Sequence, residues 1–473
     1  MVNQAAGDEL WCMDARAITS GIRRREFSAR EVVSACLERV EAVNPRINAL
    51  TEVRAEAALA AADAADRAVA EGKSLGLLHG VPVTIKGNVD LEGWATVNGC
   101  AALRGNIAHA NSPCVQNWLN AGAIVIGRSN TPEFCCRWET NNEVFGPTRN
   151  PWNAARTPGG SSGGAASSLA VGITPLAHGN DLGGSLRQPA QACGVASIRP
   201  GLGRVPAWNP SEPAEPPMGI QLMHVEGPMA RRVEDVRLGL RAMAIHDRRD
   251  PWSLASPLLD ETGPRPVVAL VTNPGGSGVN EQVASGVRRA GKLLQDAGYR
   301  VEEVEPPGIL EAADIWKVIC LGELLTGLEP AVTNICGPSL RRAFDCYRTL
   351  LPGGVTLEMY SHAFGRRRAL LRDWLEFFQR YGVVVAPVGT QPPLATDGDI
   401  ASPEGMSPVV ESFRMTVAVN ALGLPAAVVP VGTSGGLPQV VQFIGPPLSE
   451  MRCLDVAAAI EQQAGPLTPI DPR

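Results

Sequence analysis

The stretch Gly159-Gly160-Ser161-Ser162-Gly163-Gly164 is followed by Asp181-Leu182-Gly183-Gly184-Ser185-Leu186-Arg187, so two serines 24 residues apart each lie beside glycines. Glycine has no Cβ, and its backbone N–H groups can therefore turn toward a ligand and approach it closely. A hydroxyl between glycines thus lies beside donors that can stabilise an oxyanion. Both serines are candidates for catalysis.

The segment between the two loops predicts that they meet. A helix of about nine residues near 162–170 rises roughly 14 Å. A strand near 173–178 then returns the chain by roughly 20 Å. Ligands of open α/β sheets bind at strand ends, and Lys86 also follows an apolar run, Val81-Pro82-Val83-Thr84-Ile85. Lys86 is therefore a candidate partner, although its 75-residue separation from Ser161 decides nothing about contact.

The rest of the chain predicts an α/β fold in which a sheet is flanked by helices. The first 75 residues read as an N-terminal helical layer, with helices at 29–43, capped by Ser28, and at 54–71. We therefore divide the chain into an N-terminal helical segment, 1–75, packed on a catalytic domain, 76–473. Strands are expected at 81–85, 123–126, 173–178, 267–271, 383–386, 426–431 and 440–444.

Composition favours a cytoplasmic enzyme with a small neutral substrate. A net charge of -6 gives no reason to expect nucleic acid or an anionic membrane as partner. The N-terminus does not read as a signal peptide, and no apolar run approaches the roughly 20 residues of a membrane span. Eleven cysteines without a C-x-x-C pair indicate reduced thiols rather than a disulfide frame or a zinc site. No metal or cofactor is expected, and a homodimer is left open.

These loops resemble the amidase signature family of serine hydrolases. The resemblance covers nearly all of the chain, and its further motifs are Gly80 to Lys86, Gly127 to Phe134, Asn150-Pro151-Trp152, Asn420 to Pro425 and Gly436-Leu437-Pro438. It implies a large mixed β-sheet and an amidohydrolase. It also implies that Ser185 is the nucleophile, that Ser161, preceded by a cis peptide bond, relays a proton, and that Lys86 is the base.

The implied roles make physical sense. A lysine with an ordinary pKa of about 10.4 is neutral in only about one molecule in 2,500 at pH 7, so burial must disfavour the ammonium. The expected oxyanion donors are the N–H groups of Leu182, Gly183, Gly184 and Ser185. Asp181 and Arg187 are expected to form a buried ion pair that fixes the loop, and Gly160 to support it.

Two positions depart from the family pattern. Gly87 stands where the family usually has aspartate, and Asn180 where many relatives have threonine or serine. Our hypothesis is that the missing carboxylate eases the deprotonation of Lys86.

Other interpretations are compatible with parts of the sequence. Gly159-x-Ser161-x-Gly163 also fits a nucleophile elbow, which needs a histidine such as His224, His246 or His362. Cys135 is a weaker candidate nucleophile, and neither loop has the Gly-Lys-Ser/Thr ending of a P-loop.

The favoured function is hydrolysis of a carboxylic amide, with aryl amides, esters and carbamates as further substrate classes, through an acyl-serine. The alternative is an amidotransferase A-type subunit that releases ammonia from glutamine within a complex. The proline-rich loop 206–217 is either a rim over the site or a surface excursion. The pocket is expected from 131–145, 206–222 and 310–365, with aromatic and methionine candidates Trp208, Met218, Met223, Trp316 and Tyr360.

Overall fold

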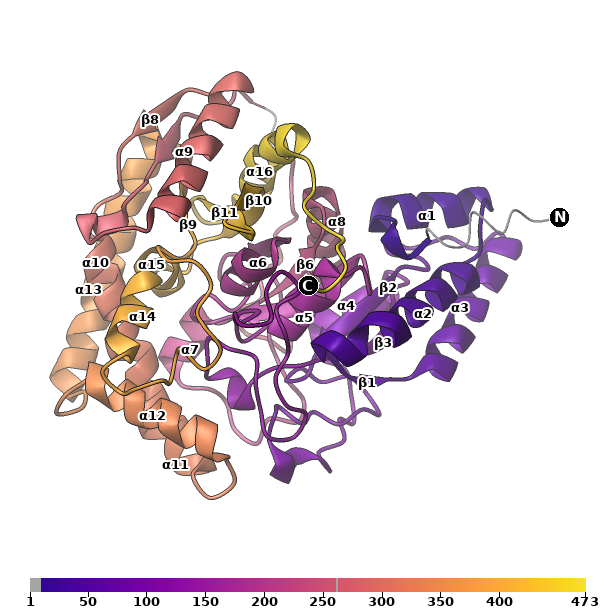
Figure 1. The fold of residues 1–473 in the computed structure, drawn as a ribbon, viewed down its shortest axis with the longest axis horizontal. Coiled ribbons are helices and arrows are strands. Elements are labelled where there is room, and N and C mark those ends of the chain that lie inside the picture. The colour runs from indigo at the N-terminus through magenta and orange to yellow at the C-terminus, as the bar shows by residue number, and fades with distance from the viewer. Residues whose placement is uncertain (1–9, 261–262) are drawn as a thin grey trace.

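The computed structural model describes residues 10–260 and 263–473, and within them one mixed sheet of eleven strands forms the centre (Figure 1). From one edge to the other the strands are Leu50–Val53 (β1), Ile124–Ser129 (β3), Pro82–Lys86 (β2), Leu176–Asp181 (β4), Val225–Ala230 (β6), Ala196–Arg199 (β5), Ala426–Ser434 (β10), Leu437–Ile444 (β11), Val383–Pro387 (β9), Val268–Leu270 (β7) and Val301–Glu303 (β8). β2 runs parallel to β3 and β4, whereas β4 runs antiparallel to β6. The predicted mixed sheet flanked by helices is confirmed.

Helices cover both faces of this sheet. They are Ala15–Arg24 (α1), Ala29–Ile47 (α2), Ala55–Ala70 (α3), Pro113–Asn120 (α4), Gly163–Ala170 (α5), Arg187–Cys193 (α6), Met218–Met223 (α7), Val233–Met243 (α8), Glu281–Asp296 (α9), Ile309–Trp316 (α10), Glu329–Val332 (α11), Pro338–Leu350 (α12), Leu357–Arg380 (α13), Met406–Ser412 (α14), Arg414–Leu422 (α15) and Glu450–Ala464 (α16). α4, α8, α9 and α16 pack on one face. α5 and α6 cover the centre of the other face, which continues into the layer of α10, α13 and α15.

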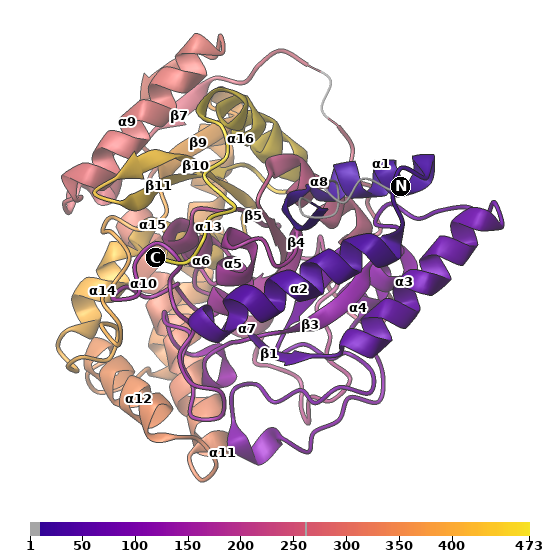
Figure 2. The same ribbon diagram turned by 45° about the vertical axis from the view of Figure 1, so that its right-hand side comes forward.

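The N-terminal segment lies at one end of the molecule, where α2 and α3 run beside each other (Figure 2). Ser28 and Glu31 form a reciprocal capping box at the start of α2, as the sequence signal for that helix predicts. The segment also supplies an unexpected strand, because β1 pairs antiparallel with β3 at the sheet edge. A domain boundary at residue 75 stays a prediction.

The strands around the glycine loops decide where these loops lie. β4 begins three residues later than the sequence pattern predicts and ends at Asp181, so the chain leaves the sheet directly into the loop of Ser185. Ser161 lies just before α5, which begins at Gly163. The antiparallel neighbour β6 was not predicted, because its Gly227-Pro228 pair is typical of a turn.

Within the described residues, no helix is both long enough and apolar enough to cross a membrane.

Candidate active site

Lys86 and Ser161 meet in the interior. Lys86 is the last residue of β2, and its Nζ lies 2.7 Å from Oγ of Ser161. Both side chains are completely buried, and the peptide bond between Gly160 and Ser161 is cis. Burial lowers the pKa of Lys86, although Cys135 and Glu226 oppose the shift. The neutral amine that a base requires is therefore favoured relative to an exposed lysine.

Gly160 occupies a position that no larger residue can fill. A Cβ there would lie 2.5 Å from the carbonyl oxygen of Arg137 and 2.6 Å from the backbone nitrogen of Glu139. Its N–H donates to Oε1 of Gln188 over 2.7 Å. Gly160 thus lets the chain before Ser161 lie directly against a neighbouring backbone.

Ser185 lies in the second glycine loop and is the more accessible of the two serines, with 9% of its surface exposed against 0% for Ser161. The backbone N–H of Ser162 donates to the carbonyl oxygen of Ser185 over 3.3 Å. The two glycine loops therefore touch, as their spacing predicts.

The turn before Ser185 leaves backbone donors free. In the described part of the chain, the N–H groups of Leu182, Gly183 and Ser185 have no hydrogen-bond acceptor. The N–H of Gly184 differs, because it donates to Oδ1 of Asp181 over 2.8 Å. Gly184 also has a φ of +100°, which favours glycine.

Two tryptophans hold the carbonyl side of this turn. Nε1 of Trp316 donates to the carbonyl oxygen of Leu182 over 2.9 Å, and Nε1 of Trp138 to that of Gly183 over 3.0 Å. The carbonyl and N–H of a trans peptide point in opposite directions, so these bonds aim the following N–H groups away from the indoles. Trp138 in turn stacks on Phe413.

Asp181 and Arg187 form the expected buried ion pair, with 3.0 Å between Oδ2 and Nε. Asp181 also accepts from Nδ2 of Asn420 and from the N–H of Leu186. Burial alone would raise the pKa of Asp181, but Arg187 holds it well below its usual range. Asn420 belongs to one of the family motifs, but no role was predicted for it, because its contact spans 239 residues.

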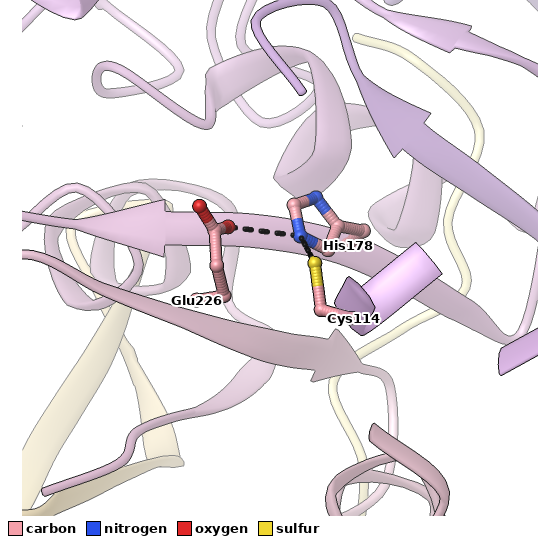
Figure 3. Close-up of side chains that lie close together, drawn as sticks. All are labelled: Cys114, His178 and Glu226. Carbon is pink, nitrogen blue, oxygen red and sulfur yellow. Dashed lines mark hydrogen bonds and ion pairs between the residues drawn. The ribbon is translucent and has the colours of Figure 1, made fainter. Parts of the chain in front are cut away.

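Asn180 was noted in the sequence only as a departure from the family pattern, and its contact with Lys86 was not predicted. Oδ1 of Asn180 lies 2.6 Å from Nζ of Lys86, and its Nδ2 faces both Asn88 and Glu226. Figure 3 shows Glu226 directed at His178, with Cys114 of α4 on the same imidazole nitrogen. Residues two apart on a strand, as His178 and Asn180 are, share a face, but no local pattern pairs them with Glu226.

Cys114, His178 and Glu226 are also residue types that bind metals. Their potential ligand atoms lie within 4.8 Å of one another, and all three residues are buried. No sequence pattern pointed to this group, because each residue comes from a different element.

The elbow interpretation finds no support. In the described residues Ser161 has a hydrogen bond with Lys86 but with no histidine. His224 faces Glu226, and His246 contacts Ser253. His362 is exposed on α13. Cys135 contacts Thr131.

The proline-rich loop is fastened to the segment that follows Lys86. Nδ2 of Asn209 donates to the carbonyl oxygen of Asn88 over 3.2 Å. The N–H and hydroxyl of Ser211 both donate to Asp90, which is buried. This part of the loop lies over residues 88–90 and thus borders the site.

The candidate pocket residues have different surroundings. Met223 is buried in the core under the sheet, whereas Met218 is half exposed. Trp208 packs against Arg249, and the hydroxyl of Tyr360 donates to Glu323. Of the five, Trp316 makes the direct contact with the glycine turn.

Comparisons with known proteins bear on the family and on the reaction. An indoleacetamide hydrolase of Bradyrhizobium diazoefficiens is 44% identical over 463 residues, which cover 97% of this chain and 88% of that protein. The A-type subunit of a glutamyl-tRNA(Gln) amidotransferase of Moorella thermoacetica is 32% identical over 481 residues, covering 96% and 97%. The solved structure of a bacterial aryl acylamidase of the amidase signature family superposes with a TM-score of 0.83 at 26% identity, covering 96% of both chains.

The higher identity to the hydrolase favours hydrolysis over the amidotransferase alternative. The model of the family described as Amidase matches residues 31–454. This chain therefore belongs to the amidase signature family and is an enzyme that hydrolyses carboxylic amides.

Proposed function

We propose that Ser185 is the nucleophile, Ser161 the proton relay and Lys86 the base in the hydrolysis of a small aryl-substituted carboxamide. The contact of 2.7 Å between Lys86 Nζ and Ser161 Oγ, fully buried and beside Ser185, carries the assignment of roles. The substrate class is supported by the indoleacetamide hydrolase relative.

In the first step the neutral amine of Lys86 accepts the proton of the Ser161 hydroxyl. Ser161 accepts the proton of Ser185 as the Oγ of Ser185 bonds to the carbonyl carbon of the amide. The carbonyl π electrons move to oxygen. The result is a tetrahedral oxyanion and an ammonium on Lys86.

The free N–H groups of Leu182, Gly183 and Ser185 are the proposed oxyanion donors. One such donor is typically worth about 3 kcal/mol in the transition state. The N–H of Gly184 already donates to Asp181, so we propose that Gly184 mainly maintains the shape of the turn.

Collapse of the oxyanion breaks the carbon–nitrogen bond, and the relay returns a proton to the leaving nitrogen. For a primary amide the leaving group is ammonia. Water then attacks the acyl-serine while Lys86 and Ser161 accept its proton. The carboxylic acid departs and Ser185 regains its proton.

The setting of the enzyme is also a proposal. We infer a cytoplasmic enzyme that acts without nucleic acid, in line with the net charge of -6 and eleven cysteines without a disulfide. A homodimer remains a prediction, which sedimentation of the purified protein would check.

The test combines labelling with turnover. A serine-reactive phosphonate should label the wild type and fail to label Ser185→Ala, whereas Ser161→Ala should label slowly. Ser168→Ala is the matched control, because Ser168 is as buried as Ser161 but donates to the backbone of Ala165. Faster labelling of Ser161→Ala than of Ser185→Ala is expected; the reverse order would favour Ser161 as the nucleophile.

Substrate choice needs a separate panel. Indole-3-acetamide and phenylacetamide should be hydrolysed with a higher kcat/KM than aliphatic amides or glutamine. A preference for glutamine would instead support the alternative function as an amidotransferase subunit.

A further inference from the structure

Asn180, Glu226 and His178 form a polar cluster between two neighbouring strands. In the antiparallel register of β4 and β6, Asn180 lies opposite Glu226. Opposite residues of paired strands lie side by side on one face. His178 shares the face of Asn180, and Cys114 of α4 lies against its imidazole (Figure 3). The ring of Trp118, also on α4, meets the same imidazole edge-on. The cluster is thus enclosed by the sheet and one helix.

The contacts run in a line from the proposed base. Nζ of Lys86 lies 2.6 Å from Oδ1 of Asn180. Nδ2 of Asn180 lies 3.5 Å from Oε1 of Glu226, and Oε2 of Glu226 lies 2.9 Å from Nε2 of His178. Each of these four side chains is at most 4% exposed, so solvent does not replace the contacts.

The donor and acceptor ends of the Asn180 amide decide which end faces Glu226 and which end faces Lys86. An asparagine amide has a donor end and an acceptor end of almost equal size, and its neighbours decide which way it points. A carboxylate only accepts hydrogen bonds. Glu226 therefore selects the NH₂ end of Asn180, together with Oδ1 of Asn88, which lies 3.2 Å from the same Nδ2, and Oδ1 of Asn180 is left for Lys86.

This orientation matters for the lone pair of the lysine. A neutral amine has two N–H donors and one lone pair. With Oδ1 of Asn180 as acceptor, Lys86 donates an N–H to it and keeps the lone pair for the hydroxyl proton of Ser161. A flipped amide would present its NH₂ group to the same lone pair and compete with Ser161.

We infer that Glu226, held by His178, is a positioning residue that fixes the amide of Asn180 and thereby directs the lone pair of Lys86 to Ser161. The inference rests on the proposed function of Lys86 as base. It adds to that function a device for keeping the base aligned, built from residues outside the glycine loops.

Several other titratable or charged side chains lie near Lys86, Asn180, Glu226 and His178. Those that face Lys86, Glu226 or its partners are Cys114 on α4, Cys135, Asp181 on β4, Arg199 on β5, Glu212 in the proline-rich loop and His224 before β6. Burial alone would raise the pKa of Glu226, but His178, His224 and Lys86 lower it below its ordinary value. This direction favours the carboxylate form of Glu226.

The decisive variant is Glu226→Gln, which keeps the size of the side chain but removes its charge and its acceptor-only character. We expect kcat to fall about tenfold or more, within the range for a displaced proton acceptor, while KM changes less than twofold. The rise of kcat/KM with pH should also move to lower pH, because loss of a nearby anion disfavours the ammonium of Lys86. Glu226→Asp, which keeps the charge, should leave that rise close to its wild-type position.

Glu450→Gln is the matched control. Glu450 is a fully buried carboxylate bonded to Arg204 and to the N–H of Gly201, without contact to Lys86. Its loss should lower stability and leave the pH profile unchanged. An unmoved profile in folded Glu226→Gln would overturn the inference.

Asn180→Ala provides a second route if Glu226→Gln does not fold. It should shift the pH profile as well, and the double variant should lose less than the product of the two single losses. Fully multiplicative effects would contradict a shared line of contacts. One equivalent of metal in the purified protein, lost in Cys114→Ser, would also overturn the role of His178, because its nitrogen would then be a ligand.

These outcomes are separable from a failure of the proposed function. If Ser185→Ala still reacts with the phosphonate, the proposed function fails. If the phosphonate labels the wild type and not Ser185→Ala, but the pH profile of Glu226→Gln equals that of the wild type, only the positioning role fails.

Discussion

Asp181 and Glu226 are two buried carboxylates on adjacent strands, yet their surroundings differ in kind. Asp181 is bonded to the permanently charged Arg187, to Asn420 and to two backbone N–H groups. Glu226 accepts from the neutral amide of Asn180, and its carboxylate oxygens lie 2.9 Å from Nε2 of His178 and 3.5 Å from Nε2 of His224. The first carboxylate is fully saturated by fixed donors, and the second is not.

The difference indicates that one carboxylate fixes the shape of the glycine turn, while the other lies near the groups that transfer protons in the proposed mechanism. A carboxylate paired with arginine keeps one charge state and one geometry, which suits the backbone turn of the proposed oxyanion donors. Glu226 instead lies near Lys86, which accepts a proton in the proposed mechanism. Substitutions can break this division, and the largest effect is expected at the arginine pair.

Arg187→Met should damage the fold as well as activity. Removing one partner of a buried ion pair typically costs about 3 to 5 kcal/mol, because the other charge is left uncompensated. Urea unfolding should show this loss, and turnover should disappear. Arg30→Met is the control, since the Arg30 pair with Asp63 is about half exposed and should change stability by less than about 1 kcal/mol. Equal losses of unfolding free energy in the two variants would show that the buried pair of Asp181 and Arg187 is no more important for stability than an exposed pair.

Asp235 extends the comparison to a buried carboxylate whose hydrogen-bond donors are the N–H groups of Ala15 and Arg16 at the start of α1. Burial raises its pKa to about 7. Its folded pKa thus exceeds the unfolded value, so its contribution to stability is complete below about pH 4 and is lost as pH rises toward 7.

Asp235→Asn should therefore flatten the fall of unfolding free energy between pH 5 and 7, by up to about 1.4 kcal/mol per pH unit. Urea unfolding at several pH values measures this slope. An unchanged slope would show that Asp235 is ionised in the folded protein.

Trp316→Phe should loosen the oxyanion turn without removing the aromatic ring. Loss of one hydrogen bond, the one to the carbonyl oxygen of Leu182, is worth about 1 kcal/mol, so kcat should fall roughly fivefold. Trp374→Phe serves as the control, because Trp374 is also buried but donates to Pro307. A similar kcat in both variants would show that the hydrogen bond from Trp316 does not hold the turn in its active shape.

Gly87→Asp should have the smallest effect. It places a carboxylate next to Lys86, which should favour the ammonium and move the rise of kcat/KM to higher pH by about one unit or less. A Cβ at this position would lie 3.2 Å from the carbonyl oxygen of Ser129, so this backbone must move by a few tenths of an ångström. A profile that stays in place would refute the hypothesis that glycine eases deprotonation.

Much of the fold and site followed from local patterns. The apolar runs predicted β2 and β3 within a few residues, and the capping signal at Ser28 predicted α2. β6 was missed because Gly227-Pro228 interrupts its pattern, although its neighbours pair with both of its edges. The same omission hid Glu226, which lies on that strand.

The sequence by itself determined which residues are candidates for the chemistry, because glycines beside serines and a lysine at a strand end are local features. The tertiary structure alone decided how these residues are supported. The contact of Asn420 with Asp181 spans 239 residues, and that of Lys86 with Asn180 spans 94. Such contacts depend on strand order and register, which arise from the packing of the whole sheet and leave no pattern in neighbouring residues.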